Sequence, residues 1–250
     1  MGPIRTLEEA ADRAWPAREA RHDDDWVARF SDGMHHRLNS ATVWAAPDLD
    51  GALAEIAAWY ATRGRPPLYR LTAASEPRLD PLLEHRGYRN GPGVAVMTRS
   101  LASAPAAPSG VSVSGLPPEG WRDAFAAMSG YGPQRRRLLE GILGRITGAT
   151  GFAVAGAGDD PAGGGMAVVD RRWAGLFEIV VHPSRRGAGH GSRVVAALLA
   201  WSRQQGARTA YLQVFEENLP ALALYRSAGF TAHHRYWYRE PPGGLPPGPR

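Results

Sequence analysis

The stretch EIVVHPSRRGAGHGS, from Glu178 to Ser192, decides the fold. It begins inside an apolar run, Leu176–Val181, that predicts a β-strand, and it ends where apolar residues at helical spacing predict a helix over His190–Gln205. Between them lies a turn with three glycines at alternate positions. Where a strand leads through such a turn into a helix, successive backbone N–H groups lie at the positive end of the helix dipole. This arrangement binds anions.

The residues of the turn show which classes of anion-binding loop it can and cannot belong to. Gly187, Gly189 and Gly191 allow the backbone to approach an anion without interference from a Cβ atom, and Arg186 adds a positive charge beside them. No Gly-Lys-Ser/Thr follows, which excludes a nucleoside-triphosphate P-loop, and the spacing is GxGxG rather than the GxGxxG of dinucleotide sites. Taken alone, the motif is equally consistent with a plain flexible loop.

A second motif, NLPALALYRSAGF, spans Asn218 to Phe230. Asn218 is suited to cap a helix with Pro220 in its first turn, and Gly229 is suited to end that helix in a left-handed conformation. Tyr225 lies seven residues after Asn218, on the same helix face. By itself a tyrosine at this position is more consistent with core packing than with chemistry, since buried tyrosines are common.

Together these segments resemble the GNAT N-acetyltransferase superfamily. Residues 186–191, RGAGHG, match its R/Q-x-x-G-x-G/A pyrophosphate motif, Ile179–Pro183 matches the strand that pairs with the pantetheine arm, and Asn218–Phe230 matches N-x-x-A-x-x-L-Y-x-x-x-G-F. The motifs occur in the family's order and cover about 175–240. The resemblance therefore implies a GNAT fold, acetyl-CoA as co-substrate and transfer of the acetyl group to an amine.

The resemblance also implies roles for individual residues. Backbone groups of the strand would hold pantetheine, the loop would hold the pyrophosphate, Asn218 would contact the cofactor arm, and Tyr225 would protonate the departing thiolate. The cofactor-binding residues carried over are Ile179, Val180, Val181, Arg186, Gly187, Ala188, Gly189, His190, Gly191, Ser192 and Asn218. A phenol of pKa ~10 can protonate a thiolate of pKa ~8.5 when the local field favours it. Because the chain has no cysteine, direct transfer in a ternary complex is expected.

The general base is a separate question. Glu178 lies just before the cofactor-binding segment, where many GNAT enzymes carry an acid, and we predict that it is the base; a solvated carboxylate is the alternative. N-terminal-alanine acetylases of the superfamily carry a glutamate five residues before the motif asparagine, but this chain has Gln213 there. That departure argues against a ribosomal-protein acetylase. Glu216 and Glu217 remain further candidates, although a polar loop explains them better.

The other segments predict a mixed α/β (α+β) sheet. Strands are expected at 68–72, 94–98, 111–114, 152–155, 166–169, 211–215 and 234–238, and helices at 53–61, 81–86, 118–129, 133–146 and 218–228, with a turn over GAGDDPAGGG.

The two halves of the chain contain a similar segment. Leu82–Tyr88 and the strand after it resemble Leu224–Phe230 and the strand after that. This similarity predicts a degenerate GNAT-like domain at 1–100, a linker at 101–110, the catalytic domain at 111–240 and a disordered tail at 241–250. The N-terminal unit lacks an RxxGxG loop, so we expect that it binds no CoA and instead forms one wall of the acceptor site. Arg37, Asn39 and Trp44 are the candidate residues of that wall.

Composition and charge limit the location and the partners that we expect for this protein. The 250 residues include 44% hydrophobic residues and carry a net charge of +5, with every basic residue an arginine. No transmembrane run or secretory signal is evident, so we expect a cytoplasmic protein without membrane contact, either a monomer or a homodimer. The arginines are scattered, which argues against specific nucleic-acid binding. The pairs His35–His36 and His233–His234 do not predict a metal site, because neighbouring strand residues point to opposite faces.

The expected acceptor is therefore the amine of a small molecule or a peptide. Two other functions stay open from the sequence: a non-catalytic acyl-CoA-binding regulatory module and an aminoacyl-tRNA-dependent transferase. The motif Tyr225 favours an enzyme over the first, and the pyrophosphate loop favours CoA over the second.

Overall fold

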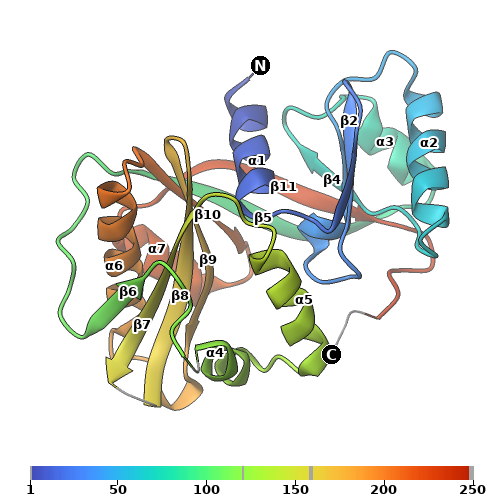
Figure 1. The fold of residues 1–250 in the computed structure, drawn as a ribbon. Coiled ribbons are helices and arrows are strands. Elements are labelled where there is room, and N and C mark those ends of the chain that lie inside the picture. Colours follow the sequence, from blue (N-terminus) through green and yellow to red (C-terminus); the bar gives the residue numbers. More distant parts are fainter. Residues whose placement is uncertain (1, 120, 158–159, 248–250) are drawn as a thin grey trace.

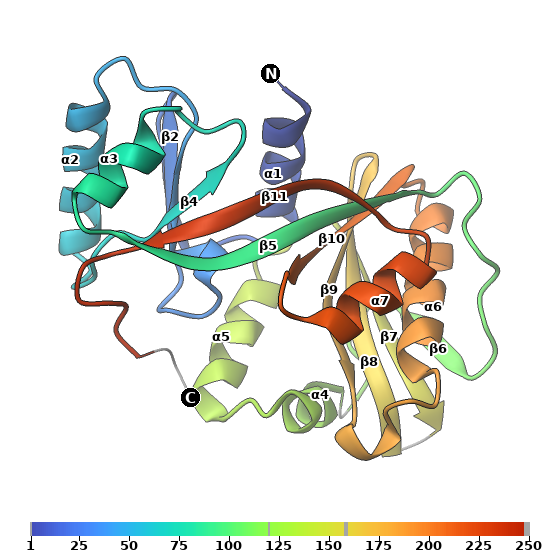
Figure 2. The same ribbon diagram turned by 180° about the vertical axis from the view of Figure 1, so that it is seen from behind.

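A computed structural model describes residues 2–119, 121–157 and 160–247. The described strands are β1 (Glu19–His22), β2 (Trp26–Phe30), β3 (Ala41–Val43), β4 (Tyr69–Thr72), β5 (Arg89–Ser100), β6 (Val111–Ser114), β7 (Ala149–Ala157), β8 (Asp160–Asp170), β9 (Trp173–Val181), β10 (Thr209–Phe215) and β11 (Thr231–Glu240). They form one mixed sheet in the order β1-β2-β3-β4-β11-β5-β10-β9-β8-β7-β6. The sheet runs through the whole molecule, with the long strands β5 and β11 crossing between its two ends (Figures 1 and 2).

Helices cover both faces of this sheet. The described helices are α1 (Pro3–Ala14), α2 (Leu49–Ala61), α3 (Leu79–His85), α4 (Trp121–Ser129), α5 (Pro133–Leu143), α6 (His190–Gln204) and α7 (Leu219–Ser227), with short 3₁₀ turns η1 (His36–Asn39) and η2 (Pro183–Arg185). Neighbouring side chains of β11 point to opposite faces of the sheet, so the helices that they contact show which helices cover the same face. Tyr236 and Tyr238 pack in one core with α1, α4 and α5, whereas Trp237 packs with α2 and α3. Met97 of β5 packs in a third core with α6 and α7.

The two halves of the chain exchange strands at the centre of the sheet. The unit β3–α2–β4–α3–β5 and the unit β9–α6–β10–α7–β11 have the same order, and β3–β4 and β9–β10 are the parallel pairs. However, β5 lies between β10 and β11, and β11 lies between β4 and β5, all antiparallel. Each half therefore contributes its last strand to a position inside the other half, and the sheet is continuous across the predicted boundary at 101–110.

The mixed α/β fold predicted from the sequence is confirmed, and each predicted helix and strand has a counterpart. The predicted turn over GAGDDPAGGG is too long, since β7 extends to Ala157 and β8 begins at Asp160, and the turn's centre at 158–159 lies outside the described residues. Helix α1 and the strands β1–β3 have no counterpart in the sequence analysis. The buried face of α1 is mostly alanine and includes Glu8, so its apolar pattern is weak.

The C-terminal segment from 241 has no helix or strand as far as 247, and residues 248–250 lie outside the described part. Leu245 nevertheless packs against the core that includes α1. The adjacent histidines His233 and His234 were expected to face opposite sides of their strand, and this is wrong. A bulge in β11 between Ala232 and His234 breaks the alternation, and the two Nδ1 atoms lie 2.8 Å apart.

A buried charged cluster holds α1 against the sheet. Glu8 of α1 and Arg70 of β4 are both fully buried, with Glu8 Oε2 3.1 Å from Arg70 Nη2. His234 Nε2 of β11 lies 2.9 Å from Glu8 Oε1. Asp12 of α1 pairs with Arg70 at 3.4 Å and also with the buried Arg29 of β2. The cluster fixes the helix whose last turn leads to Trp15, a fully buried residue.

Candidate active site

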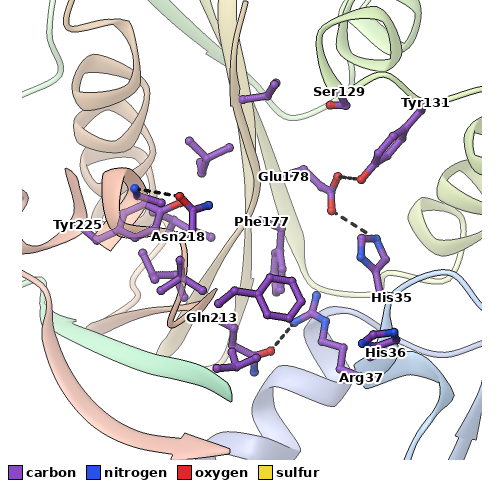
Figure 3. Close-up of a pocket in the computed structure, with 18 of the residues that line it drawn as sticks. His35, His36, Arg37, Ser129, Tyr131, Phe177, Glu178, Gln213, Asn218 and Tyr225 are labelled. Carbon is purple, nitrogen blue, oxygen red and sulfur yellow. Dashed lines mark hydrogen bonds and ion pairs between the residues drawn. The ribbon is translucent and has the colours of Figure 1, made fainter. Parts of the chain in front are cut away.

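The two parallel strands β9 and β10 separate at the middle of the sheet. They pair at only three positions, from Thr209–Trp173 to Tyr211–Gly175, and then diverge. A cavity of about 800 Å³ lies where they part. Its walls come from both diverging strands, from α7, from the α4–α5 segment and from η1 in the N-terminal half. Figure 3 shows Tyr225 and Asn218 on one side of this space and Glu178, Tyr131 and His35 on the other.

A β-bulge in β9 turns Glu178 into the cavity. Met166 pairs with Phe177 and Gly164 pairs with Val180, so two residues of β9, Glu178 and Ile179, oppose one residue of β8. Glu178 has a positive φ of 54°. The bulge resets the alternation along the strand: Phe177 and Val180 pack in the core with α1, whereas Ile179 packs on the α6 side. Such a left-handed residue costs about 1–3 kcal/mol and is typical of functional sites.

Glu178 has two polar partners and little solvent. Its side chain is 11% exposed. Tyr131 Oη donates a hydrogen bond of 2.9 Å to Glu178 Oε2, and His35 Nε2 lies 3.4 Å from Oε1. Burial raises the pKa of Glu178 above its ordinary value, although Tyr131 and two arginines, Arg37 and Arg135, oppose the shift. The carboxylate is therefore a stronger base than an exposed glutamate.

The two partners of Glu178 are held in their neutral forms. Burial, together with Arg37 and Arg135, lowers the pKa of His35 to about 3. Burial and the neighbouring carboxylate raise the pKa of Tyr131 well above its ordinary value. Both residues are thus neutral at physiological pH, so neither of them neutralises the charge of Glu178.

The far wall of the cavity is built from the N-terminal half and β10. Arg37 Nη1 donates to Gln213 Oε1 at 3.0 Å, and Tyr236 Oη donates to the same oxygen at 3.1 Å. The Arg37 guanidinium lies 4.9 Å from the centre of the Phe177 ring, which stacks on Trp15 at 4.7 Å. Gln213 is therefore an anchor for Arg37 rather than a proton acceptor for chemistry.

Tyr225 and Asn218 come from α7, on the other side of the separation. Asn218 Oδ1 accepts a hydrogen bond of 3.2 Å from Ala221 N and so caps the helix, as predicted. Tyr225 follows two turns later and is 8% exposed. Burial raises its pKa to about 12. Its hydroxyl group is therefore protonated at neutral pH.

The glycine-rich loop lies outside the cavity, at the start of α6. Gly187 and Gly189 have φ values of 80° and 77°, and a Cβ atom at either would meet no atom within 4 Å. Gly189 caps α6 without a side-chain hydrogen bond. By contrast, a Cβ at Gly191 would lie 3.3 Å from Leu224 Cδ2 and 3.5 Å from Val181 Cγ2. The first two glycines thus leave an open helix N-terminus, and the third packs it against α7 and β9.

Comparison with known proteins identifies the family. The family described as "Probable histone acetyltransferase Rv0428c C-terminal" matches residues 2–239. The chain belongs to this family. It is 30% identical over 247 residues, covering 96% of this chain and 99% of the relative, to "Uncharacterized N-acetyltransferase YobR" of Bacillus subtilis strain 168. It is 29% identical, over 94% of this chain and 73% of the relative, to "Probable histone acetyltransferase Rv0428c" of Mycobacterium tuberculosis strain H37Rv.

Solved structures agree on the fold. A GCN5-related N-acetyltransferase from Kribbella flavida superposes with a TM-score of 0.70 at 16% identity, over 99% of this chain and 97% of that one. A "Tandem GNAT protein from the clavulanic acid biosynthesis pathway" superposes with a TM-score of 0.59 at 17% identity, over 76% of this chain and 68% of that one. With the family match and the relatives above, the chain is an N-acetyltransferase with the GNAT fold.

In this N-acetyltransferase the residues singled out from the sequence fall into two groups. Glu178, Ile179, Val180, Asn218 and Tyr225 line the cavity. Val181 and the loop residues Arg186, Gly187, Ala188, Gly189, His190, Gly191 and Ser192 do not, and most of that loop is exposed. Among the acceptor-wall candidates, Arg37 lines the cavity. Asn39 instead closes a turn, its Oδ1 accepting from Ser31 N and Gly33 N.

The sequence analysis missed several residues of the acetyltransferase cavity. His35 and His36 were considered only as metal ligands, and Tyr131 and Arg135 were not considered at all, yet all four line the cavity. Tyr131 and Arg135 lie at the start of a predicted helix, whereas His35 and His36 lie where the sequence predicted no helix or strand. In residues 2–119, 121–157 and 160–247, no group of three or more His, Asp or Glu side chains is placed to hold a metal ion. Over the same residues, no helix is long and apolar enough to cross a membrane.

Proposed function

We propose that this N-acetyltransferase moves the acetyl group of acetyl-CoA to the primary amine of a small molecule or peptide, by direct transfer in a ternary complex. One observation carries the proposal. A single cavity at the separation of β9 and β10 has a protonated phenol, Tyr225, on one side and a largely buried carboxylate, Glu178, on the other. These are the proton donor and the proton acceptor that acyl transfer to an amine requires.

The residues present fit acetyl-CoA. The N-terminus of α6 is uncapped by any side chain and is approached through open glycines, which suits a pyrophosphate. Arg186, Gly187, Ala188, Gly189, His190, Gly191 and Ser192 would hold this group. The backbone N–H of His182 donates to Ala162 O of β8. Because successive N–H groups of a strand point to opposite sides, the N–H groups of Val181 and Ile179 point away from β8, into the gap between β9 and β10. There they are suited to pair with the pantetheine arm beside Val180 and Asn218.

When bound, acetyl-CoA supplies an activated thioester, and the chain supplies proton transfer and orientation. Glu178 accepts a proton from the incoming ammonium or from the attacking amine, since burial makes its carboxylate a better base. Tyr225, which is protonated at neutral pH, donates its proton toward the leaving sulfur. The free N–H groups of β9 near the thioester would stabilise the oxyanion.

The proposal gives the N-terminal half a supporting role as a degenerate GNAT-like unit. Helices α3 and α7 end alike: Gly87 and Gly229 both have φ of 80°, and Tyr88 N and Phe230 N donate to the carbonyl groups of Leu83 and Tyr225. The helix starts differ. Asp48 Oδ1 accepts from Gly51 N and caps α2, at the place where α6 is open. A carboxylate there would repel a phosphate, which supports CoA binding by the C-terminal half alone.

The test is isothermal titration of the purified protein with acetyl-CoA. The double variant Arg186→Ala, Gly189→Glu should lose binding, since it removes a cation and places a carboxylate in a left-handed position at the helix start. Arg203→Ala, at the exposed opposite end of α6, is the matched control and should bind normally. Release of CoA thiol with a panel of amines then tests turnover. Binding without any turnover would favour a regulatory module, and no binding by the wild type would refute the proposal.

The domain limits 1–100, 101–110, 111–240 and 241–250 belong to the same proposal. So do a cytoplasmic location, a monomeric or homodimeric state, and the absence of specific nucleic-acid and membrane partners.

A further inference from the structure

The cavity beyond Glu178 carries more positive than negative charge. Arg37, from η1, and Arg135, from α5, both line it, and both act electrostatically on Glu178 and on His35. Within the described part of the chain, neither guanidinium has a carboxylate within ion-pair distance. Glu178 is the one carboxylate among the described residues that line the cavity. Two cations therefore face a space that contains a single anionic side chain with a raised pKa.

Aromatic rings hold these two arginines in place. The Arg37 guanidinium lies 4.9 Å from the centre of the Phe177 ring and 5.7 Å from that of Trp15. The Arg135 guanidinium lies 4.6 Å from the centre of the Tyr131 ring. A ring face orients a guanidinium without neutralising it, and it leaves the N–H edge available to an oxygen ligand. The site thus has preorganised cations rather than internal salt bridges.

Buried donors in the same wall lack partners. Arg135 Nε and Gln213 Nε2 are buried without a hydrogen-bond partner. The orientation of the Gln213 amide follows from its Oε1, which accepts from both Arg37 and Tyr236, so its amide N–H groups remain to be satisfied. Leaving a buried donor unpaired is unfavourable, and a ligand with acceptor oxygens would relieve this cost. Both of these unpaired atoms, on Arg135 and Gln213, belong to donor groups, which complements an anion.

We propose that the acceptor is a small amine that also bears a carboxylate, an amino acid, with its carboxylate bound by Arg37 and Arg135 and its amino group directed at Glu178. This inference rests on the proposed acetyltransferase function. A guanidinium pairs with a carboxylate through two parallel hydrogen bonds, which would orient the amine. Because the cavity of about 800 Å³ must also hold the reacting end of acetyl-CoA, the acceptor has to be small. A lysine-rich peptide would instead bring further positive charge towards two arginines.

The experiment compares matched acceptors at saturating acetyl-CoA, with CoA thiol release as the readout. Each of a set of amino acids is paired with its carboxamide and with the amine that lacks the carboxylate, and a basic lysine peptide is included. We expect kcat/KM to be about 10- to 100-fold higher for the acid than for its amide, the range that a charge-assisted hydrogen bond provides. The difference should lie mainly in KM.

Substitutions then locate the source of that preference. Arg135→Gln should reduce the acid-to-amide ratio towards one. The ratio rather than the absolute rate is the readout, because Arg135 also lowers the pKa of Glu178. Arg136→Gln is the matched control on the same helix, since Arg136 pairs with Asp123 and lies in a separate surface depression with Glu140. It should keep the wild-type ratio. Arg37→Gln is a second variant, whose fold is checked by thermal unfolding because Arg37 also anchors Gln213.

Several results would overturn the inference while leaving the proposed function intact. These are equal kcat/KM for acid and amide, a preference for the lysine peptide, an Arg135→Gln ratio equal to that of Arg136→Gln, and turnover of no amino acid despite normal acetyl-CoA binding. Loss of acetyl-CoA binding by the wild type would instead refute the proposed function itself. The titration with acetyl-CoA, run on every variant, separates the two failures.

Discussion

Replacing Glu8 by Gln should destabilise the whole protein far more than its position in the sequence suggests. Glu8 and Arg70 are both fully buried and 3.1 Å apart, and His234 lies 2.9 Å from the other carboxylate oxygen. The substitution leaves a buried guanidinium with Asp12 as its remaining carboxylate partner, at 3.4 Å. Breaking a buried ion pair costs about 3–5 kcal/mol. Since Asp12 remains, we expect a loss of about 3 kcal/mol, which corresponds to roughly 6–12 °C in Tm for a chain of this size.

The adjacent residue supplies the control. Glu9 pairs with Arg5 one helical turn away at 2.9 Å, and both side chains are about one third exposed. An exposed pair of this kind contributes about 0.3–0.5 kcal/mol, so Glu9→Gln should lower Tm by no more than about 2 °C. Both variants are unfolded thermally and in urea and followed by circular dichroism. Equal, small effects of the two substitutions would refute the reasoning that the cluster holds α1 in place.

The pH dependence gives a second readout of the same substitution. Burial alone would raise the pKa of Glu8, but Arg70 and His234 outweigh it, so the folded-state pKa lies below the ordinary value of 4.5. A lowered pKa contributes stability that is present above 4.5 and is lost as the pH falls through the folded-state value. The stability gap between wild type and Glu8→Gln should therefore be widest near neutral pH and should narrow below about pH 4.5.

Two further predictions concern the proposed chemistry. Tyr225→Phe should bind acetyl-CoA as the wild type does but lose about 10²-fold in kcat, since only the proton donor is removed; unchanged kcat would show that Tyr225 merely packs. Glu178→Gln should lose about 10²- to 10⁴-fold at neutral pH, and it should also abolish the acidic limb of the pH–rate profile. In the wild type that limb should lie above pH 4.5, because burial raises the pKa of Glu178. An acidic limb that persists in the variant would assign it to another group.

The sequence predicted the local structure of the glycine-rich loop and of α7 well, because both depend on residues that are close together in the chain. The cap formed by Asn218 and the positive φ values of Gly189 and Gly229 are backbone requirements that particular residue types reveal. Each lies within a few residues of the helix end that it shapes. No long-range contact is needed to infer them.

The surroundings of Glu178 could not be predicted, because residues far apart in the sequence form them. Glu178 was expected on a regular strand, and only the bulge opposite Gly165 turns it towards Tyr131. Gly165 permits this, since a Cβ there would lie 2.5 Å from Ile179 Cδ1. The pairing of Glu178 with His35 joins residues 143 positions apart, and no periodic pattern encodes such a contact. Helix α1 was missed for the related reason that its buried face carries Glu8, whose partners lie on distant strands.

The exchange of β5 and β11 joins the C-terminal half, which carries the glycine-rich loop and Glu178, to the N-terminal half, which supplies His35. Because β5 lies between β10 and β11, the C-terminal half cannot complete its sheet without a strand from the first 100 residues. The same connection brings η1 and Trp15 against Phe177, so the half with the carboxylate-capped α2 supplies Arg37 to the cavity of the other. Under the proposed function, the open N-terminus of α6 holds the co-substrate and the N-terminal half selects the acceptor. Changes in η1 could then alter acceptor choice without disturbing the glycine-rich loop, because the two regions are held by separate contacts.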